Sequence, residues 1–280
     1  MPGVSKSSSA QAQKCVLMKS KSINLRKFLT MAVLAAPAAL ALEGRYGEPT
    51  RLTVRKLRLA NARTGLRFAQ FSDVHYKGDR VYLHSVVETL NSLAPDFCCF
   101  TGDLIEENQF LPETLEILSG IRSPVFGVPG NHDYWSRADF GTIRRCFQAT
   151  GGAWLLDQQR VIASGKITLS GSGGIYTSTI PAPGTTGGLN ILLLHYPAWV
   201  KRLGRLGKQP YDLILAGHSH GGQVQLPFFG APFLPYNVDE YVRGSYQTNA
   251  GCLYVNPGIG YIAEYDFRFN CPPEITVFEV

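Results

Sequence analysis

The sequence predicts an α/β protein in which helices pack on the faces of a sheet. From about Arg51 onward, short apolar runs of strand length alternate with segments whose apolar residues recur at helical spacing. The 280 residues are 45% hydrophobic and only 17% charged, which suits a globular protein with a sizeable core. This composition excludes the disordered and collagen-like classes.

The first 42 residues differ from the rest of the chain in charge. They hold 6 of the 27 basic residues and none of the 21 acidic ones, so the net charge of +6 belongs to the N-terminus. A nucleic-acid-binding domain would carry its basic residues on the folded part, so we expect no nucleic-acid partner. We predict a disordered basic leader over 1–27 and a hydrophobic signal or membrane-anchor segment over 28–42. An ordinary amphipathic or buried helix is the alternative for 28–42.

The predicted domain spans residues 51–280, and its first half contains three strand–helix units. Residues 52–60 alternate in polarity and predict an early strand. Apolar runs at 66–76, 95–105 and 123–135 predict three further strands, each ending in a polar turn. Apolar stripes at helical spacing follow them, at 83–93, 111–118 and 140–147. Cys98 and Cys99 lie inside the second of these apolar runs and are expected to fill the core.

The second half of the chain consists mainly of strands and loops. Residues 189–197 and 211–223 predict two more strands that end in polar turns, and a Pro/Gly/Thr-rich loop lies near 180–188. The sequence shows neither an internal repeat nor a linker that would divide this region. It therefore predicts one catalytic domain and leaves the oligomeric state open.

Residues with metal-binding chemistry follow five of the predicted strands. Five of the six histidines lie in these turns, and His84 is the exception. Sites in open α/β sheets form at the carboxyl ends of strands, so five turns can converge on one cluster. In chain order the turns carry Asp73 and His75, then Asp103, then Asn131, His132 and Asp133, then His195, and finally His218 and His220.

This mixture of side chains suits two divalent metal ions. Carboxylate, amide and imidazole ligands bind Mn²⁺, Fe, Zn²⁺ or Mg²⁺, and a pair of such ions stabilises both the attacking and the leaving oxygen of a phosphoryl displacement. Each motif alone has an ordinary structural explanation, because His-x-His occurs in turns and Asn-His-Asp can cap a helix. Their joint occurrence, each after a strand, favours a dinuclear metal centre.

The pattern also resembles a known family. Asp73-x-His75, Gly102-Asp103, Gly130-Asn131-His132-Asp133, His195 and Gly217-His218-Ser219-His220 are similar to the calcineurin-like metallophosphoesterases. The resemblance implies a β-sandwich flanked by α-helices. It implies one metal on Asp73, His75, Asp103 and His220, and the other on Asp103, Asn131, His195 and His218. Asp103 would bridge the metals, and His132 would assist the leaving oxygen without binding metal.

Within that family, HGGQVQLPFFGAPF (220–233) and RFNCPPEI (268–275) resemble the membrane-associated bacterial YkuE/YaeI-like branch. That branch includes UDP-2,3-diacylglucosamine hydrolases of lipid A synthesis. The resemblance implies hydrolysis of a phosphodiester or pyrophosphate bond, in a lipid-linked substrate, by a metal-bridging hydroxide at the bacterial cell membrane. The alternatives are a phosphodiesterase or phosphomonoesterase acting on soluble substrates, and a non-catalytic membrane scaffold.

Two features leave a choice open at this point. The stretch LPFFGAPFLPY (226–236) is unusually apolar for a loop, and it either packs internally or contacts a bilayer or an acyl chain. Asp133 either orients His132 or caps the helix that follows it.

Overall fold

A computed structural model describes residues 36–60, 64–174, 180–184, 187–205, 211–262 and 266–280. The chain divides into two units, Met1–Leu40 and Ala41–Val280. The predicted leader over 1–27, and residues 28–35 of the predicted hydrophobic segment, lie outside the described residues, while residues 36–42 are helical. No helix within the described ranges is both long enough and apolar enough to cross a bilayer.

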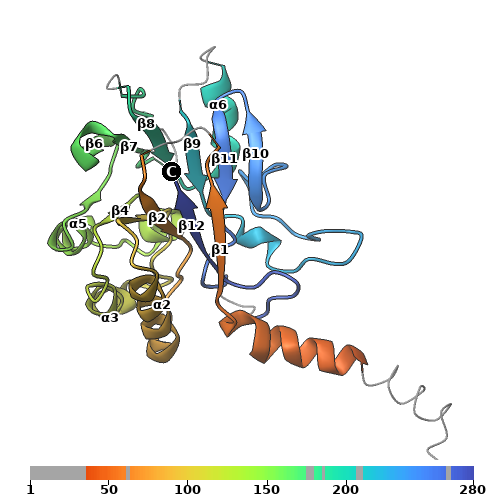
Figure 1. Cartoon of the computed structure of the whole chain (residues 1–280). Helices are drawn as coiled ribbons and strands as arrows, with labels where there is room; N and C mark the ends of the chain where they lie inside the picture. Colours follow the sequence, from red (N-terminus) through yellow and green to blue (C-terminus); the bar gives the residue numbers. More distant parts are fainter. Residues whose placement is uncertain (1–35, 61–63, 175–179, 185–186, 206–210, 263–265) are drawn as a thin grey trace, which may run out of the picture. The chain divides into compact units, whose positions relative to one another are not determined.

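The second unit contains two six-stranded sheets (Figure 1). The first sheet has the order β1 (Thr53–Arg58), β12 (Glu274–Glu279), β2 (Arg67–Phe71), β3 (Phe97–Phe100), β4 (Val125–Gly127), β5 (Ala153–Trp154). The second has the order β10 (Gly244–Thr248), β11 (Gly251–Val255), β9 (Leu213–Ala216), β8 (Leu189–Leu193), β7 (Ile167–Gly171), β6 (Gln158–Ile162). Strands β2 to β5 pair in parallel, as do β7, β8, β9 and β11.

The two sheets pack face to face, and the inner core lies between them. Phe68 and Phe97 of the first sheet belong to the same buried cluster as Leu193 and Leu215 of the second. Cys99 belongs to this inner cluster, whereas its neighbour Cys98 faces the opposite way, and both thiols are fully buried. Successive side chains of a strand point to opposite faces, so β3 is buried on both sides. The prediction that both cysteines fill the core is confirmed.

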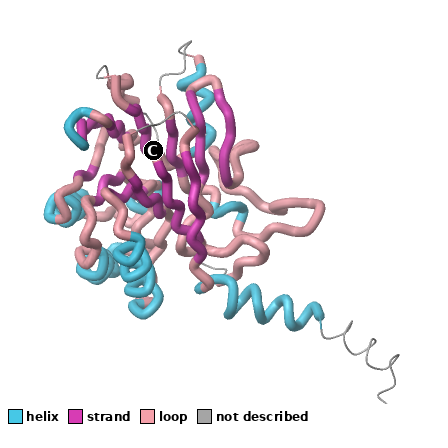
Figure 2. Tube along the Cα trace, in the orientation of Figure 1, coloured by secondary structure: helices cyan, strands magenta, loops and turns pink. Residues whose placement is uncertain are grey.

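Helices cover the outer faces of the sandwich (Figure 2). The apolar stripes of α2 (Arg80–Leu93), α3 (Leu111–Leu118) and α5 (Phe140–Ala149) pack on the first sheet, and α6 (Val200–Gly204) packs on the second. The three helices predicted from apolar spacing are therefore confirmed. The sequence pattern alone predicted helices on both faces of one sheet, but the second sheet covers the inner face, as the family resemblance implied.

Short helical segments complete the described elements. The helix α4 (Asn131–Trp135) directly follows the loop after β4, and α2 begins where the Asp79 side chain accepts a hydrogen bond from the Tyr82 N–H. The remaining segments are η1 (Glu43–Gly47), η2 (Glu48–Thr50), η3 (Asn108–Phe110), η4 (Ala163–Gly165), η5 (Pro197–Trp199) and η6 (His220–Gly222).

Candidate metal centre

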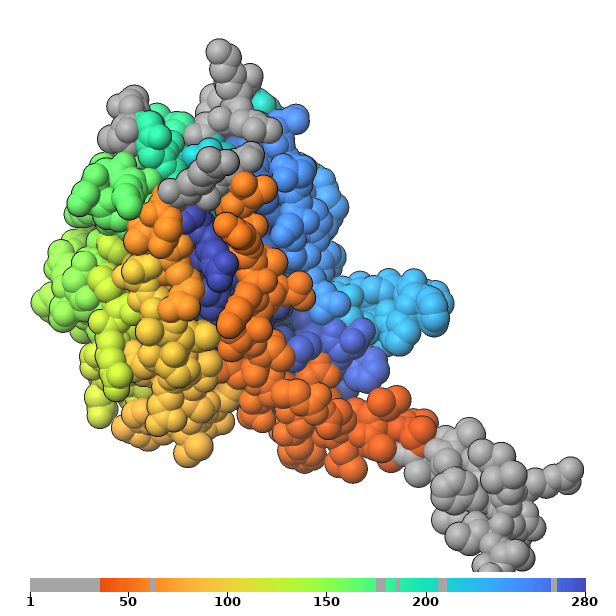
Figure 3. All heavy atoms as spheres, viewed as in Figure 1, coloured from red at the N-terminus to blue at the C-terminus, as the bar shows by residue number. Residues whose placement is uncertain are grey.

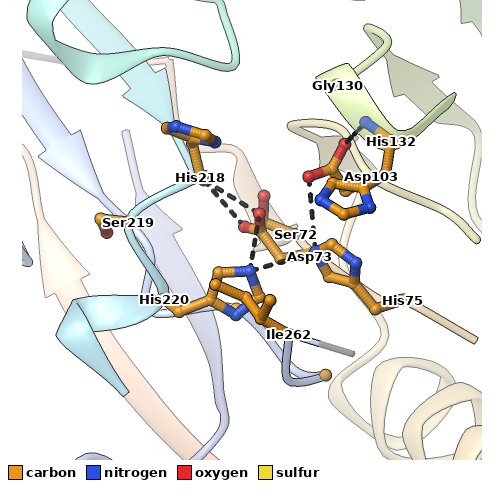
Figure 4. Close-up of polar contacts among 12 residues, drawn as sticks. Ser72, Asp73, His75, Asp103, Gly130, His132, His218, Ser219, His220 and Ile262 are labelled. Carbon is orange, nitrogen blue, oxygen red and sulfur yellow. Dashed lines mark hydrogen bonds and ion pairs between the residues drawn. The ribbon is translucent and has the colours of Figure 1, made fainter. Parts of the chain in front are cut away.

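The carboxyl ends of five strands from both sheets bring the predicted ligands together. Figure 4 labels Asp73, His75, Asp103, His218 and His220 among them. The loops after β2 and β3 carry Asp73, His75 and Asp103. The loop after β4 leads to Asn131, and the loops after β8 and β9 carry the three remaining histidines. All seven predicted metal ligands are buried, each with less than 5% of its surface exposed. By contrast, His84 is exposed on α2 and lies apart from this cluster.

One group of ligand atoms is formed by Asp73, His75 and His220. The Nε2 atoms of His75 and His220 lie 3.0 Å apart, and the Nε2 atom of His220 lies 3.6 Å from Oδ1 of Asp73. The Nε2 atom of His75 also lies 3.4 Å from Oδ2 of Asp103. Four ligand atoms thus lie as close together as the ligands of one divalent ion do.

A second group is formed by His195, His218 and Asp103, with Asn131 beside them. The Nδ1 atom of His195 lies 2.8 Å from the carbonyl oxygen of Thr101, and Nε2 of His218 lies 2.8 Å from that of Tyr236. A carbonyl oxygen only accepts, so both ring nitrogens must be donors. In the neutral imidazoles, Nε2 of His195 and Nδ1 of His218 are then unprotonated, and they face each other at 3.1 Å.

This contact between two lone pairs is unfavourable unless a proton or a metal ion lies between them. The Nε2 atom of His195 also faces two further acceptors, Oδ1 of Asn131 at 3.0 Å and Oδ2 of Asp103 at 3.2 Å. Four acceptor atoms therefore face one another here, and a backbone carbonyl holds the other ring nitrogen of each histidine. Metal ligands in proteins are arranged in this way. The residues therefore fit a divalent ion here.

Asp103 belongs to both groups. Its Oδ2 atom lies within 3.4 Å of His75 Nε2 on one side and 3.2 Å of His195 Nε2 on the other. Its Oδ1 atom accepts a hydrogen bond of 2.8 Å from the backbone N–H of His132, which fixes the plane of the carboxylate. One oxygen atom is thus positioned to be shared by two ions.

The buried carboxylates of the metal-free site favour positive charge on their neighbours. Burial lowers the pKa of His75, but its contacts with Asp103 and Glu106 outweigh this and raise the pKa to about 10. His195 behaves in the same way, since Asp103 and Asp73 raise its pKa to about 9 despite burial. Burial and the neighbouring His195 lower the pKa of His218 to about 3. In the metal-free site, His75 and His195 therefore hold protons, and the proton of His195 takes the place of a cation beside His218.

The backbone at the site is strained. Five of the seven predicted ligands have positive φ: Asp73 (52°), His75 (43°), Asp103 (62°), His218 (68°) and His220 (50°). This left-handed region is costly for residues with a Cβ atom, and such strain concentrates at functional sites. The fold thus holds these side chains in a conformation that their own backbone preferences oppose.

Asp133 stabilises the loops rather than binding in either group. Its carboxylate accepts hydrogen bonds from the backbone N–H groups of Gly130, Asp103 and Leu104, at 2.9, 3.0 and 2.8 Å. It therefore caps α4 and ties the loop after β4 to the loop after β3, so the capping alternative is confirmed. A Cβ at Gly130 would overlap the carboxylate of Asp103, which explains the glycine at that position.

His132 lies at the edge of the site and pairs with a residue that the sequence reasoning missed. Its Nδ1 atom lies 2.5 Å from Oε2 of Glu106, and the other oxygen of Glu106 lies 3.3 Å from Nδ1 of His75. Despite burial, these two histidines hold the pKa of Glu106 well below its ordinary value. Glu106 follows Asp103 by three residues in the same loop, and this spacing is the only signal that the sequence offers.

Comparisons with known proteins agree with this geometry. A family model described as calcineurin-like phosphoesterase matches residues 66–222. The metallophosphoesterase YkuE of Bacillus subtilis, described as uncharacterized, is 32% identical over 92% of this chain and 98% of its own length. The phosphodiesterase YaeI of Escherichia coli is 29% identical over 92% of this chain and 99% of its own length. The UDP-2,3-diacylglucosamine pyrophosphatase LpxG of Chlamydia trachomatis is 26% identical over 91% of this chain and 97% of its own length.

Proposed function

Because this chain belongs to the calcineurin-like metallophosphoesterase family, it is a phosphoric ester hydrolase, and we propose that it cleaves a phosphodiester or pyrophosphate bond in a lipid-linked substrate. The observation that carries the proposed chemistry is the position of Asp103 Oδ2 between His75 and His195. One metal would be held by Asp73, His75, Asp103 and His220, and the other by Asp103, Asn131, His195 and His218. The native metal is one of Mn, Fe, Zn or Mg, which this donor set does not separate.

When bound, two such ions neutralise the phosphoryl oxygens and supply a hydroxide nucleophile near neutral pH. The role of His132 follows from its contact with Glu106. Because a carboxylate only accepts, Nδ1 of His132 donates to Glu106, and in the imidazolium form of His132 the proton on Nε2 would pass to the leaving oxygen and leave the ring neutral. Glu106 is a positioning residue in this scheme, since it fixes the ring of His132 and touches no substrate atom.

An apolar cavity beside the site supports a substrate with an acyl chain. The cavity has a volume of about 680 Å³, within the range of ligand pockets, and His220 lies in its wall. Most of its lining is apolar, from two segments that meet beside η6: Val224, Pro232, Phe233, Leu234, Pro235, Ile262 and Phe267. A substrate whose phosphate reaches His220 would place its neighbouring atoms in this cavity. The name of the LpxG relative, a pyrophosphatase of UDP-2,3-diacylglucosamine, agrees with such a substrate.

The proposal is tested by comparing an acylated with a soluble substrate. We would load the full-length protein with Mn²⁺ and measure kcat/KM for UDP-2,3-diacylglucosamine and for bis(p-nitrophenyl) phosphate. Replacing Val224, which lines the cavity, by Trp is expected to lower kcat/KM about 10- to 100-fold for the acylated substrate and to leave the soluble diester unaffected.

Val161→Trp is the matched control, because Val161 is exposed on β6 and away from the cavity. It should change neither value. Equal losses on both substrates with Val224→Trp would refute the acyl site and favour a soluble substrate. If the Mn²⁺-loaded parent protein hydrolysed neither substrate, the hydrolase chemistry itself would be refuted.

A further inference from the structure

The loop that covers the cavity has an exposed aromatic surface. Phe228, Phe229 and Phe233 are 104%, 86% and 85% exposed, and no Asp, Glu, Lys or Arg occurs between residues 221 and 238. Figure 3 shows this light-blue segment as a lobe that stands out from the surface. Single exposed apolar residues are ordinary, but a cluster of three phenylalanines on an uncharged loop marks an interaction surface.

The loop has a fixed shape that keeps these rings outside. Leu226 and Gly230 exchange two backbone hydrogen bonds of 2.9 Å, which close a tight hairpin with Phe228 and Phe229 at its tip. The backbone N–H of Gln225 donates to the carbonyl of Phe269 at 2.8 Å and ties the base of the hairpin to the domain. Phe228 has a φ of 69°, a strained value for a residue with a side chain.

The N-terminal entry into the domain contacts one wall of the cavity. The Phe267 ring lines the cavity and packs directly on Gly44, and the Arg268 N–H donates to the Gly44 carbonyl at 2.9 Å. Glu48 accepts a hydrogen bond of 2.9 Å from the Asn270 N–H, which holds this entry in place. Leu42 and Tyr46 beside it are 59% and 69% exposed. Leu42 is the last residue of the apolar segment 28–42.

We propose that one apolar face, made of Leu42, Tyr46, Phe228, Phe229 and Phe233, lies on a lipid bilayer. Three observations favour a bilayer over another protein. The loop lacks charge over its whole length, the apolar segment 28–42 ends in the sequence at Leu42, and the cavity beside the loop is lined mostly by apolar residues. The phenylalanines at the hairpin tip would enter the lipid, and the cavity would receive an acyl chain from it directly. Only this last step rests on the proposed function.

A depth measurement on the full-length protein tests this proposal. Phe229→Trp would be bound to vesicles of phosphatidylcholine and phosphatidylglycerol, with or without bromine on the acyl chains. The added fluorescence should be quenched in the brominated vesicles. Val161→Trp is the control, because Val161 is also exposed but lies on β6, and its added fluorescence should be the same in both kinds of vesicle. The parent protein, with its own three tryptophans, supplies the baseline.

Three results would overturn the proposal. The first is equal quenching of the two variants, which would mean that the N-terminal segment holds the protein without contact of the loop. The second is a full-length protein that does not float with the vesicles. The third is a shift of the Phe229→Trp emission that depends on protein concentration and occurs without lipid, which would indicate a second copy as the partner. None of these readouts involves turnover, so they are independent of the hydrolase proposal.

Discussion

The carboxylate of Glu106 connects His132, proposed to assist the leaving group, to the metal site. Its Oε2 atom lies 2.5 Å from Nδ1 of His132, and its Oε1 atom lies 3.3 Å from Nδ1 of His75. A carboxylate behind an imidazole fixes its tautomer and orientation. Here one carboxylate lies beside the Nδ1 atoms of two histidines with different roles.

Replacing Glu106 by Gln should therefore reduce catalysis without removing metal. We expect kcat to fall about 10- to 100-fold, the range for residues that orient a ligand or catalytic group, with metal content close to that of the parent. Steady-state kinetics and elemental analysis of the same sample measure both. Glu107→Gln, at the neighbouring exposed position, should leave kcat unchanged. A Glu106→Gln protein with parental kcat would remove the positioning role.

Replacing His132 by Ala tests the proton donor. Removing a general acid costs about 10²- to 10⁴-fold in rate, and His132 belongs to neither proposed ligand set, so the variant should bind metal normally. The loss should be smaller for a diester with a good leaving group, such as a nitrophenolate, than for an alkyl diester. The same loss on both substrates would speak against proton donation to the leaving oxygen.

Asp103→Ala should abolish both turnover and metal loading. Each of the two ligand groups loses an oxygen atom when this carboxylate is removed, and the backbone N–H of His132 loses its acceptor. Isothermal titration with Mn²⁺ measures the loss as a change in both the affinity and the number of ions bound. A variant that still binds two ions with parental affinity would exclude the shared oxygen.

Asp133→Asn should destabilise the fold and act on the metal site only through the loops. The buried carboxylate accepts three backbone N–H groups, and the amide nitrogen of Asn would face at least one of those donors. An unmatched buried group of this kind costs about 1–3 kcal/mol in the free energy of unfolding. Asp139→Asn is the matched control, since Asp139 is an exposed cap of α5 and Asn caps a helix equally well. Equal denaturation midpoints for the two variants would contradict the prediction.

The metal-free protein should lose stability at alkaline pH. The folded-state pKa values of His75 and His195, about 10 and about 9, lie above the ordinary value of about 6.5. Their protonation therefore contributes stability that is complete below about pH 6.5 and is lost as the pH rises through 9 to 10. Bound Mn²⁺ replaces these protons, so the metal-loaded protein should keep its stability across this window. Denaturation with chelator and with Mn²⁺ at several pH values gives the difference, which should grow with pH.

The proximity of these residues could be predicted from the sequence because strand ends are visible as polar residues after apolar runs. All seven predicted ligands lie together, since parallel strands place their carboxyl ends at one edge of the sandwich. The sequence did not show in the same way which element covers the inner face of the first sheet. A run such as Phe97–Phe100 is buried on both sides whether helices or a second sheet cover it, so the pattern predicts burial without naming the partner.

Glu106 and β12 show two further limits. Glu106 directly follows the apolar run 95–105, but its role depends on reaching His132 in another loop. The C-terminal strand β12 lies between β1 and β2, parallel to the first and antiparallel to the second. Such pairing between residues more than 200 positions apart leaves no local signal in the sequence.

The five left-handed residues of the metal centre also predict how relatives of this protein would decay. Glycine adopts this conformation with little cost, so a lineage released from selection for catalysis could gain stability by placing glycine or asparagine at positions 73, 75, 103, 218 and 220. Glycine at several of these positions would thus mark a descendant that keeps the sandwich and has lost the chemistry. An intact set of strained aspartates and histidines is, in turn, a signature of continued selection for turnover.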